Sequence, residues 1–280
     1  YCNARDEWGF GKQSTAALNR AALVAAAADA ATSGRQLYLG RGTIAIDDQV
    51  AITSGIDVFG EGDSTELIVS GADKNGFVVN GNNRVSFRGF KVNSDTASTV
   101  PYKAGVVAYN ANDVTLEHVI MDSISWAGVW AQDASRLRIA HCKFAGVLSL
   151  SIGNCGDIVA YRVIDSTIEG NDCNGGGWQG ILVQKPDALI ETGHSKNVRI
   201  INNRISNQSA YGICVYEFER GDCRHHIIGN KIHNIGGANP NGAGCNGITV
   251  VGSGGTLVAE NEIWDCCKTT ANQTLTPAGI

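Results

Sequence analysis

A short block of apolar residues recurs along the chain from Arg84 onward, and no other feature of the sequence constrains the fold as much. The apolar side chains take the first, third, sixth and eighth places of each block. The first three copies are Val85, Phe87, Phe90, Val92, then Val114, Leu116, Val119, Met121, then Leu137, Ile139, Cys142, Phe144. The fourth is Tyr161, Val163, Ser166, Ile168, and three more begin at Val198, His225 and Thr256. Such a repeat indicates stacked coils of similar length with loops of variable size between them.

Two further patterns follow the same period. Asparagine takes the sixth place in the later copies, at Asn203, Asn230 and Asn261, where stacked amides can form a hydrogen-bonded ladder. A glycine followed by alternating apolar residues recurs at Gly105, Gly128, Gly180, Gly212 and Gly247, and we place Ser149 at the equivalent position of the third coil. Short strands of this kind bury their apolar faces only by stacking coil on coil, and parallel connections are right-handed. The sequence therefore predicts an all-β fold, a right-handed parallel β-helix (solenoid), with its clearest repeats over 84–265.

One helix is expected ahead of the coils. Residues 14–32 are rich in Ala and Leu, with Ser14 or Thr15 as the N-cap and Gly34 just past the end. This helix would cap the open strand edges of the first coil. We interpret residues 1–280 as a single domain, and because the chain opens at Tyr1 without a methionine we expect further chain at one or both ends.

Composition excludes several classes of function. The chain has 35 Gly, 4 Pro, 18% charged residues and a formal net charge of -5. An acidic chain with scattered Lys and Arg is not expected to bind nucleic acid, and no apolar run is long enough to cross a membrane. Nine cysteines without CxxC spacing do not form a zinc motif, so neither a metal nor a cofactor is predicted.

Three segments carry a resemblance to a known family. They are Thr15-Ala16-Ala17-Leu18, then Leu37-Tyr38-Leu39-Gly40-Arg41-Gly42-Thr43, then Val58-Phe59-Gly60-Glu61-Gly62, followed by the coil repeats. The chain resembles the pectate-lyase-like superfamily of right-handed β-helix proteins, which includes polysaccharide lyases and hydrolases, phage tailspike depolymerases and mannuronan C5-epimerases. The resemblance implies a polysaccharide or glycan partner, an extracellular, secreted or virion-associated location, and a homotrimer as one candidate assembly. The chain lacks the family's catalytic motifs, such as Asp-Pro-His and Arg-x-Pro-x-x-Arg, so no catalytic residue is carried over.

The glycine-led strands predict a carbohydrate-binding face. Residues two and four places after each glycine point outward, and equivalent residues stack about 4.8 Å apart in adjacent coils. Aromatic rings on this face can stack on sugars while amides bond to hydroxyls, and Trp178 lies in the longest inter-coil insertion, the expected rim of a cleft. The predicted substrate-binding residues are Trp130, Gln132, Asp133, Gln184, Tyr109 and Trp178.

Charged residues at the ends of two of these strands are the first catalytic candidates. Lys185 and Glu217 fall at one offset in neighbouring coils, and Asp187 and Glu219 lie just beyond. A glycoside hydrolase needs two carboxylates about 5 to 9.5 Å apart, which Asp187 with Glu217 or Glu219 could supply. The alternative is that Lys185 and Glu217 form a simple surface salt bridge.

A lyase would instead use a base beside a neutralising cation, for which the candidates are Lys185, Arg220 and Tyr216. Two hypotheses follow for the whole chain. The first is a carbohydrate-active enzyme that cleaves a polysaccharide by hydrolysis or β-elimination. The alternative is a non-catalytic glycan-binding or structural β-helix, such as an adhesin or a viral tail element.

Overall fold

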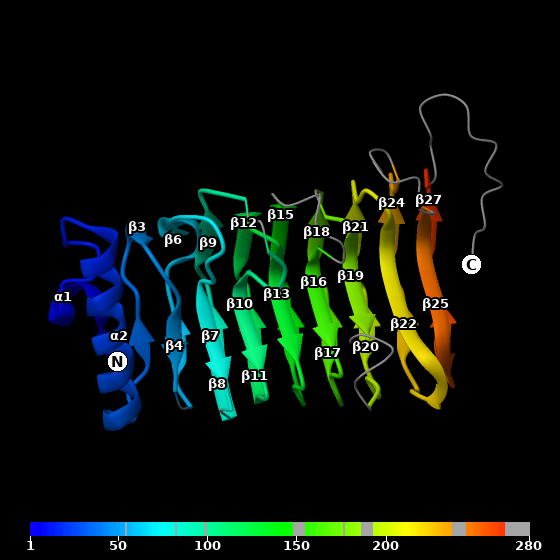
Figure 1. Cartoon of the computed structure of the whole chain (residues 1–280), viewed down its shortest axis with the longest axis horizontal. Coiled ribbons are helices and arrows are strands. Elements are labelled where there is room, and N and C mark those ends of the chain that lie inside the picture. The colour runs from blue at the N-terminus through cyan, green and yellow to red at the C-terminus, as the bar shows by residue number, and fades with distance from the viewer. Residues whose placement is uncertain are drawn as a thin grey trace.

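The chain winds into a parallel β-helix whose successive coils contribute strands to three sheets (Figure 1). The computed structural model describes residues 1–53, 55–81, 83–97, 100–147, 155–175, 177–185, 193–236 and 245–266, without the side chains of 83 and 218–221. Within these residues every pairing between neighbouring strands is parallel, and each strand inside a sheet pairs with strands of the preceding and following coils. The parallel β-helix predicted from the repeat is confirmed.

The three sheets run the length of the molecule. Sheet A consists of β1 (Cys2–Asn3), β2 (Leu37–Tyr38), β5 (Asp57–Phe59), β8 (Asn83–Arg88), β11 (Asn112–Glu117), β14 (Arg138–Ala140), β17 (Thr167–Glu169), β20 (Arg199–Ile201), β23 (His226–Ile228) and β26 (Leu257–Ala259). Sheet B consists of β3 (Gly42–Ile46), β6 (Thr65–Val69), β9 (Lys91–Ser94), β12 (Ile120–Ile124), β15 (Lys143–Val147), β18 (Asp172–Asn174), β21 (Arg204–Ser206), β24 (Lys231–His233) and β27 (Glu262–Trp264). Sheet C consists of β4 (Val50–Ile52), β7 (Phe77–Asn80), β10 (Ala104–Tyr109), β13 (Ala127–Gln132), β16 (Gly156–Tyr161), β19 (Gln179–Gln184), β22 (Tyr211–Asp222) and β25 (Asn246–Gly254).

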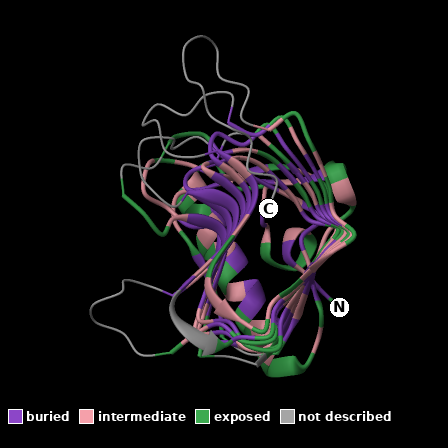
Figure 2. Cartoon of the chain, turned by 90° about the vertical axis from the view of Figure 1, so that its right-hand side faces the viewer, coloured by how far each residue is buried: buried purple, intermediate pink, exposed green. Residues whose placement is uncertain are grey.

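The sharp corners between sheets are made by single residues in the left-handed conformation. At the corner between sheets A and B the stacked residues His118, His141 and Asn202 have φ of 53°, 53° and 56°. A single left-handed residue bends the chain sharply, so consecutive strands can enter different sheets without a long loop. Seen along the axis, the coils superpose with their corners aligned (Figure 2).

An N-terminal helix covers the first coil, as predicted. The helix α2 (Ala16–Ser33) begins after Thr15, whose Oγ1 accepts a hydrogen bond from the Leu18 N–H at 3.3 Å, and it ends at Gly34. Its Leu23 side chain is fully buried against the coil below. A second, shorter helix, α1 (Ala4–Trp8), precedes α2, and a 3₁₀ turn, η1 (Gly62–Ser64), follows β5. Both helices lie at one end of the row of strands (Figure 1).

The register of the fourth coil differs from the one expected. Ile168 pairs with Ile139, so Ser166, not Tyr161, takes the first place of the block, and Asn171 takes the sixth. Tyr161 and Val163 have the spacing of the motif, but Tyr161 ends β16 in sheet C. The expected fourth copy was therefore placed five residues too early.

The asparagine ladder is confirmed and begins one coil earlier than expected. The Nδ2 of Asn171 donates to Oδ1 of Asn203 at 2.9 Å, Asn203 donates to Asn230 at 3.0 Å, and Asn230 donates to Asn261 at 2.9 Å. Each acceptor Oδ1 also receives the backbone N–H of the preceding asparagine, at 2.9 to 3.0 Å. Because both bonds cross from coil to coil inside the molecule, the ladder fixes the register of the last four coils.

Candidate functional site

The outer face of sheet C is covered by its own side chains. The alternate residues that point away from the core pack into a second apolar cluster, separate from the main core, whose members include Val107, Trp126, Val159, Tyr161, Leu182 and Cys214. The first outward row was expected to be exposed, yet Val107, Leu182 and Cys214 are buried. A sheet with apolar side chains on both faces is typical of fully parallel sheets.

The third coil also has a different register from the one expected. The strand equivalent to the glycine-led strands is β16, because Val159 pairs with Trp130 and with Leu182. Ser149 does not lead it and lies outside the described residues. The outward rows therefore contain Val159 and Tyr161 at this coil.

A repeated bulge starts three strands of sheet C, namely β13, β19 and β22. The N–H groups of Trp178 and Gln179 both donate to the Cys155 carbonyl, at 3.0 and 3.2 Å, and those of Ala210 and Tyr211 both donate to the Trp178 carbonyl. Two residues that face one partner form a β-bulge, which redirects the side chains beside it.

Glycine after the bulge lets the coils stack closely. A Cβ on Gly212 would lie 2.5 Å from the Gly247 carbonyl oxygen and 2.5 Å from Cγ2 of Ile232. These glycines thus bring the bulge residues of successive coils next to one another.

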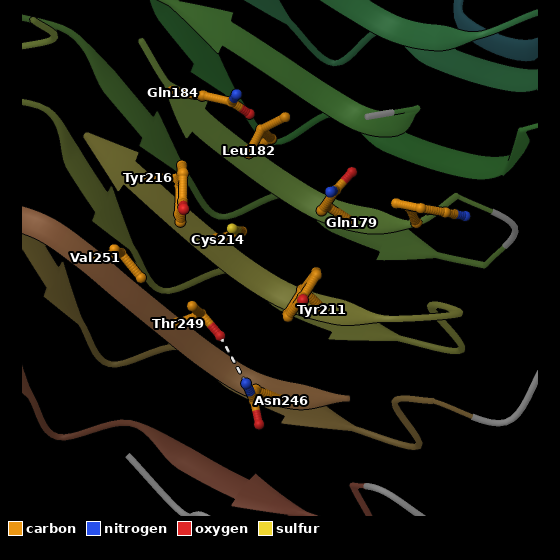
Figure 3. Close-up of a pocket in the computed structure, with 10 residues that line it drawn as sticks. Gln179, Leu182, Gln184, Tyr211, Cys214, Tyr216, Asn246, Thr249 and Val251 are labelled. Atoms are coloured by element: carbon orange, nitrogen blue, oxygen red, sulfur yellow. Dashed lines mark hydrogen bonds between the residues drawn. The ribbon is translucent and has the colours of Figure 1, made fainter. Parts of the chain in front are cut away.

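A cavity of about 340 Å³ opens over the last three strands of sheet C (Figure 3). The strand register arranges its lining as three rows of three, one residue from each of β19, β22 and β25. The rows are Gln179, Tyr211, Asn246; then Leu182, Cys214, Thr249; then Gln184, Tyr216, Val251. Trp178 completes the lining. We call this cavity the sheet C pocket, and its volume is within the range of about 300–1,000 Å³ of ligand pockets.

Two polar atoms at one end of the sheet C pocket have no hydrogen-bond partner. They are Oε1 of Gln179, a side chain only 3% exposed, and Nε1 of Trp178. Asn246 by contrast donates to Oγ1 of Thr249 at 3.0 Å (Figure 3). A buried acceptor and a buried donor without partners among the described residues cost free energy.

The described lining of the sheet C pocket carries no charged side chain. Among its described lining residues none is an Asp, Glu, Lys, Arg or His. Burial raises the pKa of the Cys214 thiol to about 12, so this cysteine is a neutral thiol at physiological pH and not a nucleophilic thiolate. Burial likewise raises the pKa of the Tyr211 hydroxyl, which stays protonated.

Three predicted residues meet in the sheet C pocket, namely Trp178, Gln184 and Tyr216. Sequence reasoning missed Gln179, Tyr211 and Asn246. Each stands immediately before the glycine of its strand, and this shared position is the signal that could have found them.

The predicted aromatic residues of earlier coils lie outside the sheet C pocket. Trp130 packs between Tyr102 and Tyr109, with ring centroids 5.0 and 6.3 Å away. Gln132 donates to Oδ2 of its neighbour Asp133 at 3.3 Å. Arg162 donates to both carboxylate oxygens of Asp133 at 2.5 Å, so this carboxylate is already fully engaged by a guanidinium.

Lys185 and Glu217 do not form the surface salt bridge considered above, because neither is at the surface. Lys185 is 3% exposed and Glu217 is 0% exposed. Glu217 continues the extended strand β22 after Tyr216, so the alternation of the strand turns its side chain inward. Asp187 lies outside the described residues, as do the side chains of Glu219 and Arg220, so neither proposed catalytic pairing is placed.

Glu217 belongs to a buried polar cluster at the corner between sheets C and A. Its Oε1 accepts from the Ser195 N–H at 3.2 Å, and its Oε2 lies 3.4 Å from Nδ1 of His194. Nδ1 of His225 accepts the Val198 N–H at 3.2 Å, which leaves the proton of the neutral ring on Nε2, 4.0 Å from Glu217.

Burial sets the charge states in this cluster. Burial raises the pKa of the Glu217 carboxyl, against the opposing effect of hydrogen bonds from Ser195 and of His194. Burial lowers the pKa of His225 to about 4, so this ring is neutral near pH 7.

One group in the described chain has the spacing of metal ligands, at the opposite end of the molecule. Cys2, Glu7 and Asp29 place their ligand atoms within 4.8 Å of one another. The Arg35 guanidinium already pairs with both carboxylates, 3.1 Å from Glu7 and in direct contact with Asp29, and a second cation there would be repelled.

Comparison with known proteins identifies the fold. The family described as "right handed beta helix region" matches residues 75–263. The surface adhesin PfbA of Streptococcus pneumoniae superposes with a TM-score of 0.69 at 15% identity, over 96% of this chain and 74% of that one. The Dettilon tailspike protein gives a TM-score of 0.55 at 16% identity, over 82% of this chain and 50% of its own length. The A-module of the Azotobacter vinelandii mannuronan C-5 epimerase AlgE4 gives 0.53 at 14% identity, over 99% and 98%.

No curated protein sequence matches the chain. These three proteins share the fold of this chain. The chain spans about half the length of the tailspike protein. Among the described residues, no helix combines the length and apolarity needed to cross a bilayer.

Proposed function

We propose that this chain, which belongs to the right-handed β-helix family, binds a glycan in the sheet C pocket. The observation that carries the proposal is the meeting of aromatic rings and amides in one cavity. The rings are Trp178, Tyr211 and Tyr216, and the amides are Gln179, Gln184 and Asn246. Flat rings offer an apolar surface to the C–H faces of sugars, and amides can both donate to and accept from hydroxyl groups.

The similar structures support a carbohydrate-related role. One is an epimerase of mannuronan, a polysaccharide, and two others are a surface adhesin and a tailspike. On the same grounds we propose an extracellular or virion-associated location. The homotrimer stays a prediction, which light scattering of the purified chain would check.

Substitution in the sheet C pocket tests the proposal. A glycan array followed by isothermal titration calorimetry would identify a ligand of the wild-type chain. We expect Trp178→Ala and Tyr216→Ala each to weaken binding at least tenfold, about 1.4 kcal/mol, because each removes a stacking surface.

The matched control is Trp264→Ala on sheet B, which removes a half-exposed indole stacked on His233, away from the pocket. Binding should be unchanged in this variant. Equal losses in the pocket and control variants, or no glycan bound by the wild type, would overturn the proposal.

Cleavage of the glycan is the second candidate function, and the raised pKa of Glu217 favours it. A general acid needs a carboxyl whose pKa lies above its usual range, and burial shifts the pKa of Glu217 in that direction. Its side chain is fully buried, however, and the described lining of the sheet C pocket contains no carboxylate that could be its partner. Binding without cleavage is therefore the function that the described geometry supports better.

The two functions are separated by following reaction products on acidic and neutral polysaccharides. Reducing ends indicate a hydrolase, and reducing ends together with unsaturated uronic ends indicate a lyase. We expect neither signal above background. Product formation that disappears in Glu217→Gln would replace the binding proposal with the catalytic one.

A further inference from the structure

The described lining of the sheet C pocket contains groups that can hydrogen-bond to a sugar, but it contains no charged side chain. Its described lining consists of three aromatic, three amide, three aliphatic or hydroxyl residues and one thiol that is neutral at physiological pH. This inference rests on the proposed glycan binding and concerns which class of glycan is bound.

The described charged residues that come directly after the last pocket-lining residues of β19 and β22 are buried. Lys185 follows Gln184 and Glu217 follows Tyr216, yet both charged side chains are buried while their neighbours line the cavity. One step earlier in the same ladder, Arg162 is held by both oxygens of Asp133. The described charged residues at these positions are therefore either ion-paired, as Arg162 and Asp133 are, or buried, as Lys185 and Glu217 are.

An acidic sugar would meet an energetic penalty in such a cavity. Its carboxylate would lose hydration without gaining a cation or a second donor in fixed position, and buried charge without a partner is strongly unfavourable. A neutral sugar loses only hydroxyl hydration. The water on its hydroxyls can be replaced by hydrogen bonds to the amides of Gln184 and Asn246, which both donate and accept.

We propose that the sheet C pocket selects an uncharged sugar over a uronic acid of the same configuration. The side-chain amides of Gln184 and Asn246, which are only partly buried, are the groups that recognise its hydroxyls, and the rings of Tyr211 and Tyr216 hold its apolar face.

Matched ligand pairs test the selectivity. Oligosaccharides of glucose, galactose and mannose are compared with oligomers of the corresponding uronic acids, which differ at carbon 6. Calorimetry on the whole chain measures both affinities. We expect the bound neutral oligomer to have a Kd at least tenfold lower than its acidic counterpart, with little dependence on salt, since no ion pair forms.

The outcomes separate this inference from the proposed function. An acidic oligomer that binds as tightly as the neutral one, or more tightly, overturns the selectivity and leaves glycan binding intact. Failure of every oligomer of both classes to bind overturns glycan binding itself.

Installed charge provides the second test. Gln184→Lys places a cation in the sheet C pocket and should move preference towards the acidic oligomer by tenfold or more. Gln132→Lys is the matched control, because Gln132 stands in the same outward row two coils earlier, outside the pocket. It should leave the preference unchanged, and an equal change in both variants would contradict the assignment to this pocket.

Discussion

At the scale of single residues, Asp157 is the clearest departure from the repeat. It occupies the glycine position, between Gly128 and Gly180 in the neighbouring coils. A Cβ on Gly128 would lie 2.4 Å from Cδ1 of Phe144, but the residue that pairs with Phe144 in the next coil is Cys173, which is much smaller. The smaller side chain leaves room in the core for a carboxyl group.

Asp157 is buried and its charge is disfavoured. Gln208 donates from Nε2 to Oδ2 at 2.7 Å, and burial, with a smaller contribution from Asp172, raises the pKa of Asp157 well above its usual range. The unfolded carboxyl ionises near pH 4, whereas the folded one ionises only at a higher pH. Stability is therefore lost as the pH rises from about 4 towards the folded pKa.

Asp157→Asn should remove this loss. Asparagine keeps an oxygen for Gln208 and cannot ionise, so we expect a Tm higher than wild type by about 2 °C or more at pH 8 and no gain at pH 3.5. Thermal denaturation at the two pH values measures the difference. A variant that is equally or less stable at pH 8 would show that Asp157 is ionised in the folded chain.

Several single residues could be read from the sequence, and others could not. Gln184 and Tyr216 were placed on one face by strand alternation, which is visible in the sequence, and Trp178 was placed beside them because it lies in the longest insertion between coils. The burial of Lys185 and Glu217 could not be predicted from the sequence. The direction of a side chain beyond a strand end depends on whether the backbone turns there or continues extended. Asp133 turns with a φ of 54°, whereas Glu217 continues in β22.

At the scale of elements, the asparagine ladder holds three of the inter-coil corners. Asn203 donates to Asn230 and to the Ile168 carbonyl, and it accepts from both the backbone and the side chain of Asn171. All of these groups are buried. Each would be left without a partner if the amide were removed.

Asn203→Ala should therefore cost about 1–3 kcal/mol for each buried group it leaves unsatisfied. Urea denaturation measures the loss. Asn207→Gly is the control, because Asn207 joins an exposed amide ladder through Asn174 and glycine tolerates its φ of 58°. A loss in the control as large as that of Asn203→Ala would argue against burial as the cause.

The elements were predicted as far as their apolar spacing was regular. Coils with strictly periodic side chains were placed in register. Tyr161 and Val163 have the apolar spacing of the motif, so the predicted start of the fourth block was placed too early. The bulges that start the strands of sheet C carry no apolar signature, so the residues they position were missed.

At the scale of the whole molecule, each coil contacts only the coils beside it. Stability in such a solenoid is close to a sum of neighbouring terms, so damage at one end need not reach the other. The helix α2 lies at the end opposite the sheet C pocket (Figure 1).

Thr15→Ala should consequently weaken the first coils without affecting binding. Loss of the N-cap costs about 1 kcal/mol. Hydrogen exchange should become faster in α2, β3 and β4, while exchange in β22 and glycan affinity stay the same. Faster exchange along the whole chain would show that the coils unfold as one cooperative unit.

The rows of the sheet C pocket take one residue from each of three consecutive coils. A ligand that contacts a full row therefore connects three coils across two coil boundaries. These contacts run parallel to the solenoid axis, the direction in which neighbouring coils separate when the molecule unfolds from its end. Pulled from its end, the molecule would unwind coil by coil until it reached the occupied rows, where several coils would have to release together. The same three strands that form a binding surface would then set the mechanical strength of that end of the molecule.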